Sequence, residues 1–419
     1  MTSWLVPRQW LTADQLRMVE LSPERHRVVA GTPGSGKTQV LLHRAVWLRD
    51  RFRVPGDNLR VFVFTNALKN YIASALPLLG LPPSCVSTFD RWCCDTYRRV
   101  MRRPLPCVVE EGEARPDFRA IRYAVFMWAQ DLRARDRPFH YVMVDEGQDL
   151  DAASFGILAA VAHHVTVGID FRQQIYDRVI REDEILALLG LLREEIVFLA
   201  SFRCCPWVAR LAGRFLDDPL ERAAWLTELR AAQGEKELPL LFVAGSAEDE
   251  AERLVEILRS RLLRHEQVVV LLPRRRLVAA WAEFLARKRV EVEVYPEIDF
   301  SSARPKLIAY HSAKGLTADT VLMPSLTAGA FDKYDAALQL RLLYVGITRA
   351  RRWAYLSTVR NGAGLFPPLT RLLDPAAAEI CAFQRSESTQ GNGQESEITE
   401  DDIDKLLSDN TSNDPLSLL

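Results

Sequence analysis

Side chains able to bind and cleave a nucleoside triphosphate stand near the start of this 419-residue sequence. The apolar run Arg27 to Ala30 predicts a strand, and an amphipathic helix is predicted from about Gln39 to Arg51. Between them lies the stretch Gly31-Thr32-Pro33-Gly34-Ser35-Gly36-Lys37-Thr38. A strand, a GxxxxGK(S/T) loop and a helix in this order are typical of a P-loop, whose backbone amides face phosphate oxygens. We therefore expect Lys37 to reach the β- and γ-phosphates of ATP and Thr38 to ligate Mg²⁺.

A second acidic group follows the apolar run His140 to Val144, which also predicts a strand. That run ends in Asp145-Glu146-Gly147-Gln148-Asp149. A carboxylate at the C-terminal end of a parallel strand beside a P-loop can hold Mg²⁺ through water, and we assign this role to Asp145. Glu146 is then placed to activate the attacking water as general base. Taken alone, the same five residues fit an ordinary turn with an acidic helix cap equally well.

These motifs belong to an ordered series. Val144-Asp145-Glu146-Gly147-Gln148-Asp149 resembles the DEAQD box of the UvrD/Rep/PcrA-like superfamily 1 helicases, and eight further boxes follow the family's order between residues 11 and 350. They are Leu11-Thr12-Ala13-Asp14-Gln15, Ala30 to Thr38, Phe64-Thr65-Asn66, Ser87-Thr88-Phe89, Gly168 to Tyr176, Phe202-Arg203, His311-Ser312-Ala313-Lys314-Gly315-Leu316 and Arg341 to Ala350. One box would be weak evidence, whereas nine in order are specific.

The resemblance implies contacts to the nucleotide beyond the two acids. Gln15 would read the adenine edge, Phe202 would stack on adenine where the family has tyrosine, and Gln173 would sense the γ-phosphate. The remaining nucleotide-binding positions are glycines and small polar residues, namely Gly31, Thr32, Gly34, Ser35, Gly36 and Gly315. The family's glutamate after KGL is replaced by Thr317, which removes the expected ribose contact. ATP and Mg²⁺ are thus the predicted cofactors.

Hydrolysis needs positive charge on the γ-phosphate in the transition state, and two arginines suit this role. Arg203 follows an apolar run, and Arg349 lies inside the Thr348-Arg349-Ala350 stretch, where we expect a helix to start. An arginine reaching across a cleft between two domains would make hydrolysis depend on domain closure. In isolation, a surface ion pair is the simpler interpretation of Arg203.

Candidate nucleic-acid contacts are Phe64, Thr65, Asn66, Thr88 and His311. Short polar side chains hold phosphates without reading sequence, and an aromatic ring can stack on a base. Phe62 and Phe64 alternate in a predicted strand, so one of the two rings must face the core. The family resemblance implies single-stranded DNA and movement from 3′ to 5′. Backbone contacts alone do not exclude RNA.

The fold expected is α/β, with two RecA-like domains whose parallel sheets are flanked by helices and whose ATP site lies in the cleft between them. We predict the first domain over residues 1–195 and the second over 196–375. Second-half strands are expected at Pro239 to Ala244, Gln267 to Leu272, Val290 to Tyr295 and Lys306 to Tyr310, with helices at Ala247 to Arg264 and Arg274 to Arg289.

Full-length relatives carry a large insertion in each domain, and both are reduced here. Residues 90–139 leave room for a small helical remnant, whose pairs Arg98-Arg99 and Arg102-Arg103 either touch DNA or line a solvated helix face. Between Arg203 and His311 there is just enough chain for the core. We therefore predict DNA-stimulated ATP hydrolysis and translocation more firmly than duplex unwinding.

Composition agrees with a nucleic-acid binder once the net charge is counted separately for residues 1–384 and residues 385–419. Residues 385–419 hold nine acidic and two basic residues and so carry −7, which leaves +6 on residues 1–384 out of a net −1. The acidic end, residues 376–419, is predicted to be a flexible tail that docks a protein partner, solubilises the chain or competes with DNA. No export signal, membrane span or CxxC spacing among the seven cysteines is visible, which favours the cytoplasm.

Two functions follow. The first is an ATP-dependent single-stranded DNA translocase or helicase in repair, recombination or phage defence. The alternative is a DNA-stimulated ATPase subunit that regulates a partner such as a nuclease, motivated by the missing insertions and the acidic tail. A catalytically dead scaffold is disfavoured because Lys37, Asp145, Glu146 and Arg349 are all present.

Overall fold

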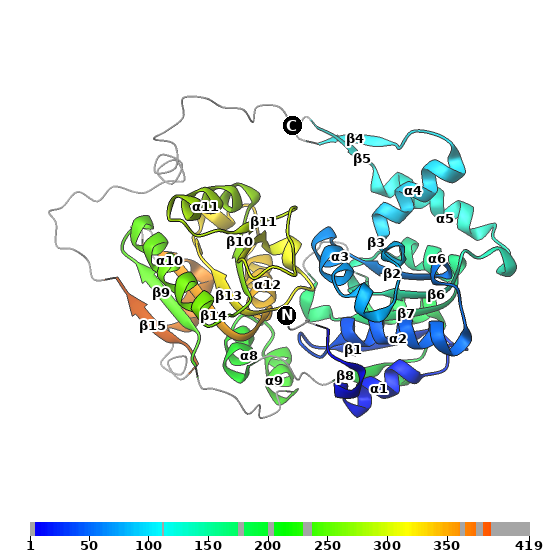
Figure 1. Cartoon of the computed structure of the whole chain (residues 1–419), viewed down its shortest axis with the longest axis horizontal. Helices are drawn as coiled ribbons and strands as arrows, with labels where there is room; N and C mark the ends of the chain where they lie inside the picture. Colours follow the sequence, from blue (N-terminus) through cyan, green and yellow to red (C-terminus); the bar gives the residue numbers. More distant parts are fainter. Residues whose placement is uncertain are drawn as a thin grey trace. The chain divides into compact units, whose positions relative to one another are not determined.

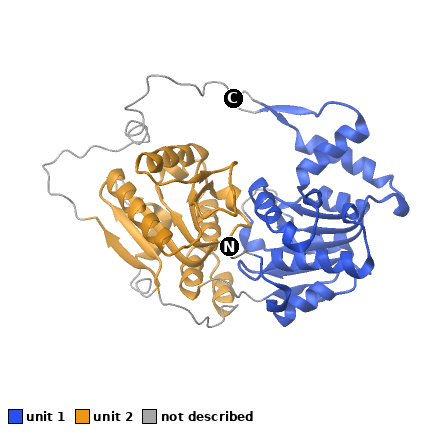
Figure 2. Cartoon of the chain, viewed as in Figure 1, with its two compact units in different colours: residues 1–203 blue, residues 204–419 orange. Residues whose placement is uncertain are grey.

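The computed structural model describes residues 5–110, 113–174, 180–199, 205–228, 237–360, 365–373 and 380–386. The chain divides into two compact units, residues 1–203 and 204–419, which are coloured separately in Figure 2. Each unit is built on a parallel β-sheet flanked by helices (Figure 1). The predicted α/β class with two RecA-like domains is confirmed.

In the described part of unit 1, six parallel strands lie in the order β3-β2-β6-β7-β1-β8. The strands are β1 Arg27–Gly31, β2 Leu59–Val63, β3 Val86–Thr88, β6 Phe139–Val144, β7 Ala162–Ile169 and β8 Val197–Leu199. The helices are α1 Ala13–Glu20, α2 Lys37–Phe52, α3 Asn66–Ala73, α4 Phe89–Met101, α5 Phe118–Gln130, α6 Ala152–Val161 and α7 Glu182–Leu189. The carboxyl ends of the neighbouring strands β6, β7 and β1 share one edge, which is where parallel sheets of this kind bind ligands.

The chain between β3 and β6 is a small insertion made of α4, a hairpin and α5. The hairpin pairs β4 Cys107–Glu110 with β5 Glu113–Pro116 in antiparallel register. The helices are anchored in the core of unit 1, because Trp92 of α4 and Ile121 and Val125 of α5 belong to its buried cluster. The sequence predicted a helical remnant here and missed the hairpin.

In unit 2, the described residues form a sheet of seven parallel strands in the order β11-β12-β10-β13-β14-β9-β15. The strands are β9 Leu240–Ala244, β10 Val268–Leu272, β11 Glu293–Val294, β12 Lys306–Ala309, β13 Ala318–Met323, β14 Ala350–Val359 and β15 Ala382–Arg385. The helices are α8 Pro206–Gly213, α9 Pro219–Glu228, α10 Ala247–Leu263, α11 Arg275–Arg287 and α12 Ala336–Ile347. Every residue of β9 and β10 is buried, as expected for strands covered on both faces.

Both predicted domain limits need correction. The first domain was predicted to end at residue 195, but β8 pairs with β1 and extends unit 1 to residue 203. The acidic tail was predicted from residue 376, but β15 pairs with β9 as an edge strand of the second sheet. Strand β11 is also much shorter than the predicted run Val290 to Tyr295.

Within the described ranges, no helix combines the length and apolar composition that a membrane crossing requires.

Candidate nucleotide site and nucleic-acid groove

The loop between β1 and α2 has the backbone geometry that only glycine adopts freely. Gly34 has φ 80° and Gly36 has φ 86°, both in the left-handed region. A Cβ added at Gly31 would lie 2.4 Å from Ser35 Oγ, so the loop folds back closely on itself. The hydroxyls of Thr32 and Ser35 are buried and have no hydrogen-bond partner. Orphaned hydroxyls inside a glycine-rich loop fit the phosphate group that the sequence predicts there.

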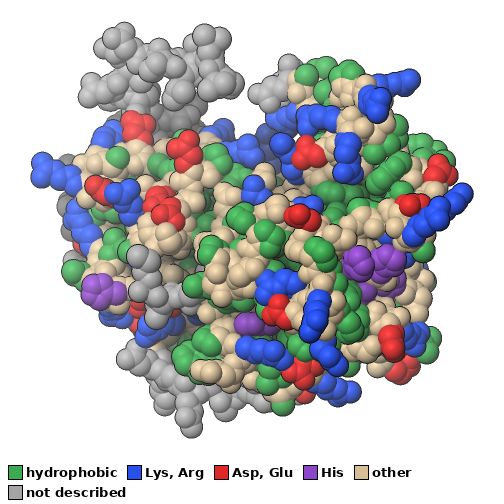
Figure 3. All heavy atoms as spheres, turned by 45° about the vertical axis from the view of Figure 1, so that its right-hand side comes forward, with side chains coloured by type: hydrophobic (Ala, Val, Ile, Leu, Met, Phe, Trp, Pro, Cys, Tyr) green, Lys and Arg blue, Asp and Glu red, His purple; other side chains and the backbone are tan. Residues whose placement is uncertain are grey.

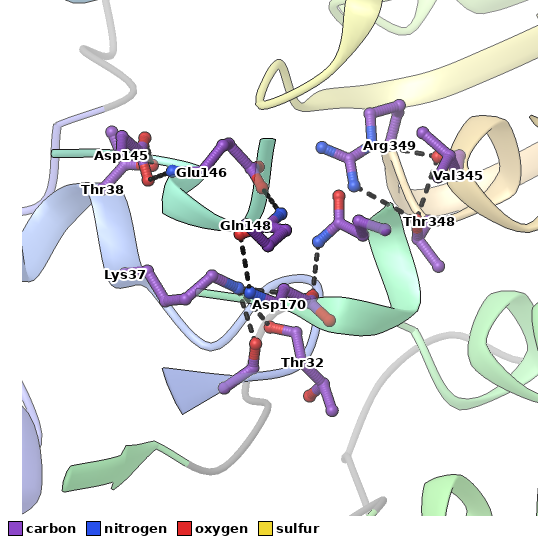
Figure 4. A network of polar contacts seen from close by, with 12 residues as sticks. Thr32, Lys37, Thr38, Asp145, Glu146, Gln148, Asp170, Val345, Thr348 and Arg349 are labelled. Atoms are coloured by element: carbon purple, nitrogen blue, oxygen red, sulfur yellow. Dashed lines mark hydrogen bonds and ion pairs between the residues drawn. The ribbon is translucent and has the colours of Figure 1, made fainter. Parts of the chain in front are cut away.

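Lys37, the first residue of α2, lies over this loop with only 7% of its side chain exposed. Its Nζ donates to the carbonyl oxygens of Gly31 at 2.6 Å and Thr32 at 3.3 Å, and lies 3.4 Å from Asp170 Oδ2 (Figure 4). The ammonium is thus held by acceptors at the carboxyl ends of β1 and β7. A phosphate reaching the loop would meet a positioned positive charge.

The residues predicted to hold magnesium are in direct contact. Thr38 Oγ1 donates to Asp145 Oδ2 at 2.6 Å, and the amide of Glu146 donates to Asp145 Oδ1 at 3.1 Å. Burial, and next the charge of Glu146, raise the pKa of Asp145 to about 6. Mg²⁺ prefers hard oxygen ligands and would favour the charged form of this carboxylate. The oxygens present therefore fit a magnesium ion.

Glu146 has φ 56°, a left-handed conformation that is unusual for a residue with a side chain. Its Oε2 accepts a 2.6 Å hydrogen bond from Gln148 Nε2, and Gln148 Oε1 accepts one from the amide of Asp170 at 3.0 Å. Asp170 Oδ2 in turn accepts from Gln173 Nε2 at 2.5 Å. One continuous network thus connects the predicted base, the P-loop lysine and the predicted γ-phosphate sensor (Figure 4).

Two members of that network had no assigned role in the sequence-based prediction. Gln148 bridges Glu146 to Asp170, and Asp170 contacts both Lys37 and Gln173. Both lie inside the boxes named above, Gln148 four residues after β6 and Asp170 directly after β7, and this position was the signal for them. Gln15 lies beside the P-loop, where its Nε2 donates to Ser35 O at 2.8 Å and its Oε1 accepts from Thr12 N. Its predicted adenine contact stays a prediction.

In unit 2 the two C-terminal boxes contact each other. Arg349 is buried and donates to the carbonyl oxygens of Val345 at 3.0 Å and Leu316 at 3.3 Å and to Thr348 Oγ1 at 3.2 Å. It lies between the end of α12 and the start of β14, not at the predicted helix start. Gly315 has φ 79° and so requires glycine.

One further site position, His311, can be placed. His311 is half-buried, and burial, followed by the charge of Lys314, lowers its pKa. The predicted residues Phe202 and Arg203, and the box residues Ile175 and Tyr176, lie outside the described residues.

Three of the four candidate nucleic-acid contacts of unit 1 line one groove of about 700 Å³. Phe64, Asn66 and Thr88 all face it. Thr65 caps α3 by accepting from Leu68 N, and Thr88 caps α4 by accepting from Arg91 N. Phe62 is 1% exposed and packs against Phe89 with ring centroids 5.3 Å apart. Phe62 is therefore the core member of the alternating pair, which leaves Phe64 for the groove.

Two RecA-like sheets, one of them carrying a P-loop, define a P-loop NTPase with a second, P-loop-free domain. Family models agree: the UvrD/REP helicase N-terminal domain matches residues 11–122, and the UvrD-like helicase C-terminal domain matches residues 307–357. Together the two matches support a UvrD-like helicase.

Individual relatives are more distant. A probable DNA helicase of Mycoplasma pneumoniae is 25% identical over 248 residues, which are 54% of this chain and 45% of that protein. The chain thus spans less than half the length of this relative. A solved C-terminal domain of a possible DNA helicase from Lactobacillus plantarum aligns with 19% identity and a TM-score of 0.35 over 45% of this chain and all of that one.

Proposed function

We propose that the chain is an ATP-dependent motor of the helicase type that moves along single-stranded DNA. The observation that carries this proposal is the buried group of unit 1, in which Thr38 Oγ1 lies 2.6 Å from Asp145 Oδ2 beside a lysine held over the P-loop. The two UvrD-like domains support it. Movement from 3′ to 5′, in the cytoplasm and in DNA repair, recombination or phage defence, is part of the proposal by analogy.

Each role follows from the chemistry of the side chain. Lys37 holds the β- and γ-phosphates, and Thr38 and Asp145 provide oxygens for Mg²⁺. Bound Mg²⁺ would neutralise charge that develops on the phosphate oxygens. Glu146 accepts the proton of the attacking water, and its bond from Gln148 Nε2 orients the carboxylate for that task. Gln173, bonded to Asp170, is positioned to relay the state of the γ-phosphate.

The catalytic charge from the second unit is assigned to Arg349, and Arg203, the last residue of unit 1, is assigned as a further cation. The guanidinium of Arg349 is held at the end of α12 by three acceptors, so a single rotamer is fixed before any nucleotide binds. A preorganised donor loses little freedom in the transition state, which is why such groups accelerate hydrolysis strongly.

Steady-state ATP hydrolysis, measured without nucleic acid and with single-stranded DNA, duplex DNA or RNA, tests the proposal. We expect single-stranded DNA to stimulate turnover most. Lys37→Ala should lower stimulated turnover at least about 100-fold, because the phosphates lose their positioned cation. Glu146→Gln keeps the shape but not the base, so it should retain bound ATP while turnover falls about 100-fold or more.

Lys333→Ala is the control for the lysine and Glu194→Gln the control for the glutamate, since both parental side chains are exposed. Both controls should hydrolyse ATP at the parental rate. Parental turnover in Lys37→Ala or Glu146→Gln would contradict the site, and stimulation by RNA alone would contradict the proposed DNA substrate.

A second candidate function rests on the size of the insertion. Between β3 and β6 the described chain holds α4, a hairpin, α5 and one short 3-10 turn. Between α8 and β12 the described chain holds α9 and then the alternating strands and helices of the second sheet. A subunit that regulates a partner nuclease through ATP-driven closure needs no unwinding of its own, and the acidic residues beyond 386 would offer a docking segment. Strand displacement by the purified chain separates the two: robust unwinding without a partner contradicts the subunit role.

A further inference from the structure

The groove of unit 1 has two walls of different origin. One wall comes from the strand ends that carry the family's boxes, with Phe64 and Asn66 after β2 and Thr88 at the end of β3. The opposite wall comes from the insertion, with Leu105 before the hairpin, Pro116 at the end of β5 and Phe118 at the start of α5. The insertion is therefore a structural part of the groove and not an appendage above it.

Positive charge gathers along the groove. Lys69 of α3 and Arg91 and Arg98 of α4 all line it. Figure 3 shows Lys and Arg side chains grouped with hydrophobic ones near the top of the face it draws. Single-stranded nucleic acids bind where a basic groove tracks the backbone beside aromatic rings. The mixture of residues fits that class of ligand.

Arg91 and Arg98 both form ion pairs with one carboxylate, that of Asp95. Asp95 Oδ2 lies 3.0 Å from Arg91 Nε, and Asp95 Oδ1 lies 3.2 Å from Arg98 Nη1. All three side chains are at least half exposed, so these ion pairs contribute little stability and a phosphate can replace the carboxylate. The acid that lines the groove, Asp90, is itself engaged by Arg122 at 3.6 Å. The lining therefore keeps its positive character.

The aromatic side chain of the insertion is the distinctive element. Phe118 is 38% exposed, although it sits at the start of a helix whose other face is core. A ring left open in a basic groove is suited to stack on a base, which every base permits because each has a flat π-face. Bases in a duplex are already stacked on one another, so this contact selects single strands.

We propose that the insertion forms the second wall of a single-strand binding groove, in which Phe118 stacks on a base and Arg91 and Arg98 hold phosphates. This rests on the proposed function and deepens it by assigning strand contacts to residues outside the nine boxes. In this proposal the function of the short insertion is to form one wall of the groove that binds single-stranded nucleic acid.

Equilibrium binding of a fluorescent oligo(dT) to the full chain, followed by anisotropy, tests the proposal. Phe118→Ala should weaken binding by about 5- to 100-fold, the range found for loss of one base-stacking ring. Tyr123→Ala is the matched control, because Tyr123 is a 65% exposed aromatic residue of the same helix that does not line the groove. Thermal unfolding of both variants checks that the fold is intact.

Stacking and charge are separated by a second ligand and a second pair of variants. On an oligonucleotide of abasic spacers, Phe118→Ala should bind like the parental chain. Arg98→Ala should weaken binding to both ligands and reduce the slope of log affinity against log salt by about 0.7, whereas Arg99→Ala, its exposed neighbour in α4, should change the slope less. Asp95→Asn should tighten binding because it frees both arginines.

The outcomes distinguish this inference from the proposed function. If oligo(dT) stimulates ATP hydrolysis but Phe118→Ala and Arg98→Ala bind it as their controls do, the groove assignment is wrong and the motor stands. An equal loss by Phe118→Ala on abasic and dT ligands would overturn stacking. If the parental chain neither binds oligo(dT) nor is stimulated by it, both proposals fall.

Discussion

Gly147 stands where the DEAQD box of the resembled family has alanine, and its surroundings explain the difference. Its φ does not lie in the left-handed region, so the backbone would accept alanine. The space would not, because an added Cβ would lie 2.2 Å from Cγ1 of Val167 on β7. Val167 is fully buried and cannot move aside freely. The glycine is thus matched to the valine on the neighbouring strand.

This leads to a stability prediction at the residue scale. Gly147→Ala should lower the free energy of unfolding by about 1–3 kcal/mol through overpacking, measured by denaturant titration. Val167→Ala alone should also destabilise, because it leaves a cavity. In the double variant the two effects should offset each other, giving a coupling energy of about 1 kcal/mol or more. Strictly additive effects would show that the two side chains do not compete for one space.

The roles of individual residues near the P-loop could be predicted because the chain itself positions them. Lys37 and Thr38 follow a strand and a loop of fixed geometry, so their placement needs no long-range information. The Gln148–Asp170 bond joins residues 22 positions apart that follow the adjacent strands β6 and β7, and only the sheet order brings them together. Spacing in the sequence does not contain that order, which is why this link was missed.

At the scale of elements, most predicted strands and helices shift by one to three residues, whereas several elements had no prediction, among them the hairpin β4–β5 and strand β15. The hairpin β4–β5 has no hydrophobic alternation of its own beyond Val108 and Val109. Strand β15 lies in a stretch whose acidic surroundings resemble a linker. Both are stabilised by pairing with another segment, a property that local composition does not report.

Strand β15 protects an apolar edge. It pairs with β9 from Ala382↔Leu240 to Arg385↔Val243, and Gln384 Oε1 accepts from Arg253 Nη2 at 2.7 Å. Two truncated chains isolate its effect: one ending at Ile380 and one ending at Ser386. The shorter chain should unfold more easily by about 2 kcal/mol or more, because it loses at least four hydrogen bonds to this segment, each contributing about 0.5–1.5 kcal/mol.

The shorter chain should also aggregate sooner on heating, because it leaves the fully buried strand β9 as an exposed edge. Light scattering during a thermal scan measures this. Since both chains lack residues 387–419, that segment does not enter the comparison. Equal unfolding midpoints for the two chains would mean that β15 contributes nothing to the sheet.

At the scale of the whole molecule, the residues of the proposed reaction are divided between two units. The P-loop, Asp145, Glu146 and the proposed groove belong to residues 1–203. The buried Arg349 belongs to residues 204–419. A motor needs such a division, because hydrolysis that depends on both units couples the nucleotide state to their movement. The requirement can be examined by removing the second unit's charge while the first unit stays intact.

Arg349→Ala should reduce DNA-stimulated turnover about 1,000-fold or more, as loss of an arginine finger does, while binding of a fluorescent ATP analogue changes little. The split is expected because the guanidinium acts on charge that develops only in the transition state. Arg349→Lys keeps one positive charge without the forked donors and should recover only part of the rate. The alanine variant leaves the carbonyl oxygens of Val345 and Leu316 without their donor. If that variant unfolds for this reason, Arg349→Lys provides the test in its place.

Arg352→Ala is the matched control, since Arg352 is an exposed arginine three residues further along the same segment. It should hydrolyse ATP at the parental rate. Parental turnover in both Arg349 variants would remove this residue from the reaction. A parallel loss of nucleotide affinity and turnover would instead mean that the guanidinium supports ground-state binding, because an interaction made only in the transition state lowers the rate alone. The measured ratio of the two losses therefore decides how the second unit takes part in hydrolysis.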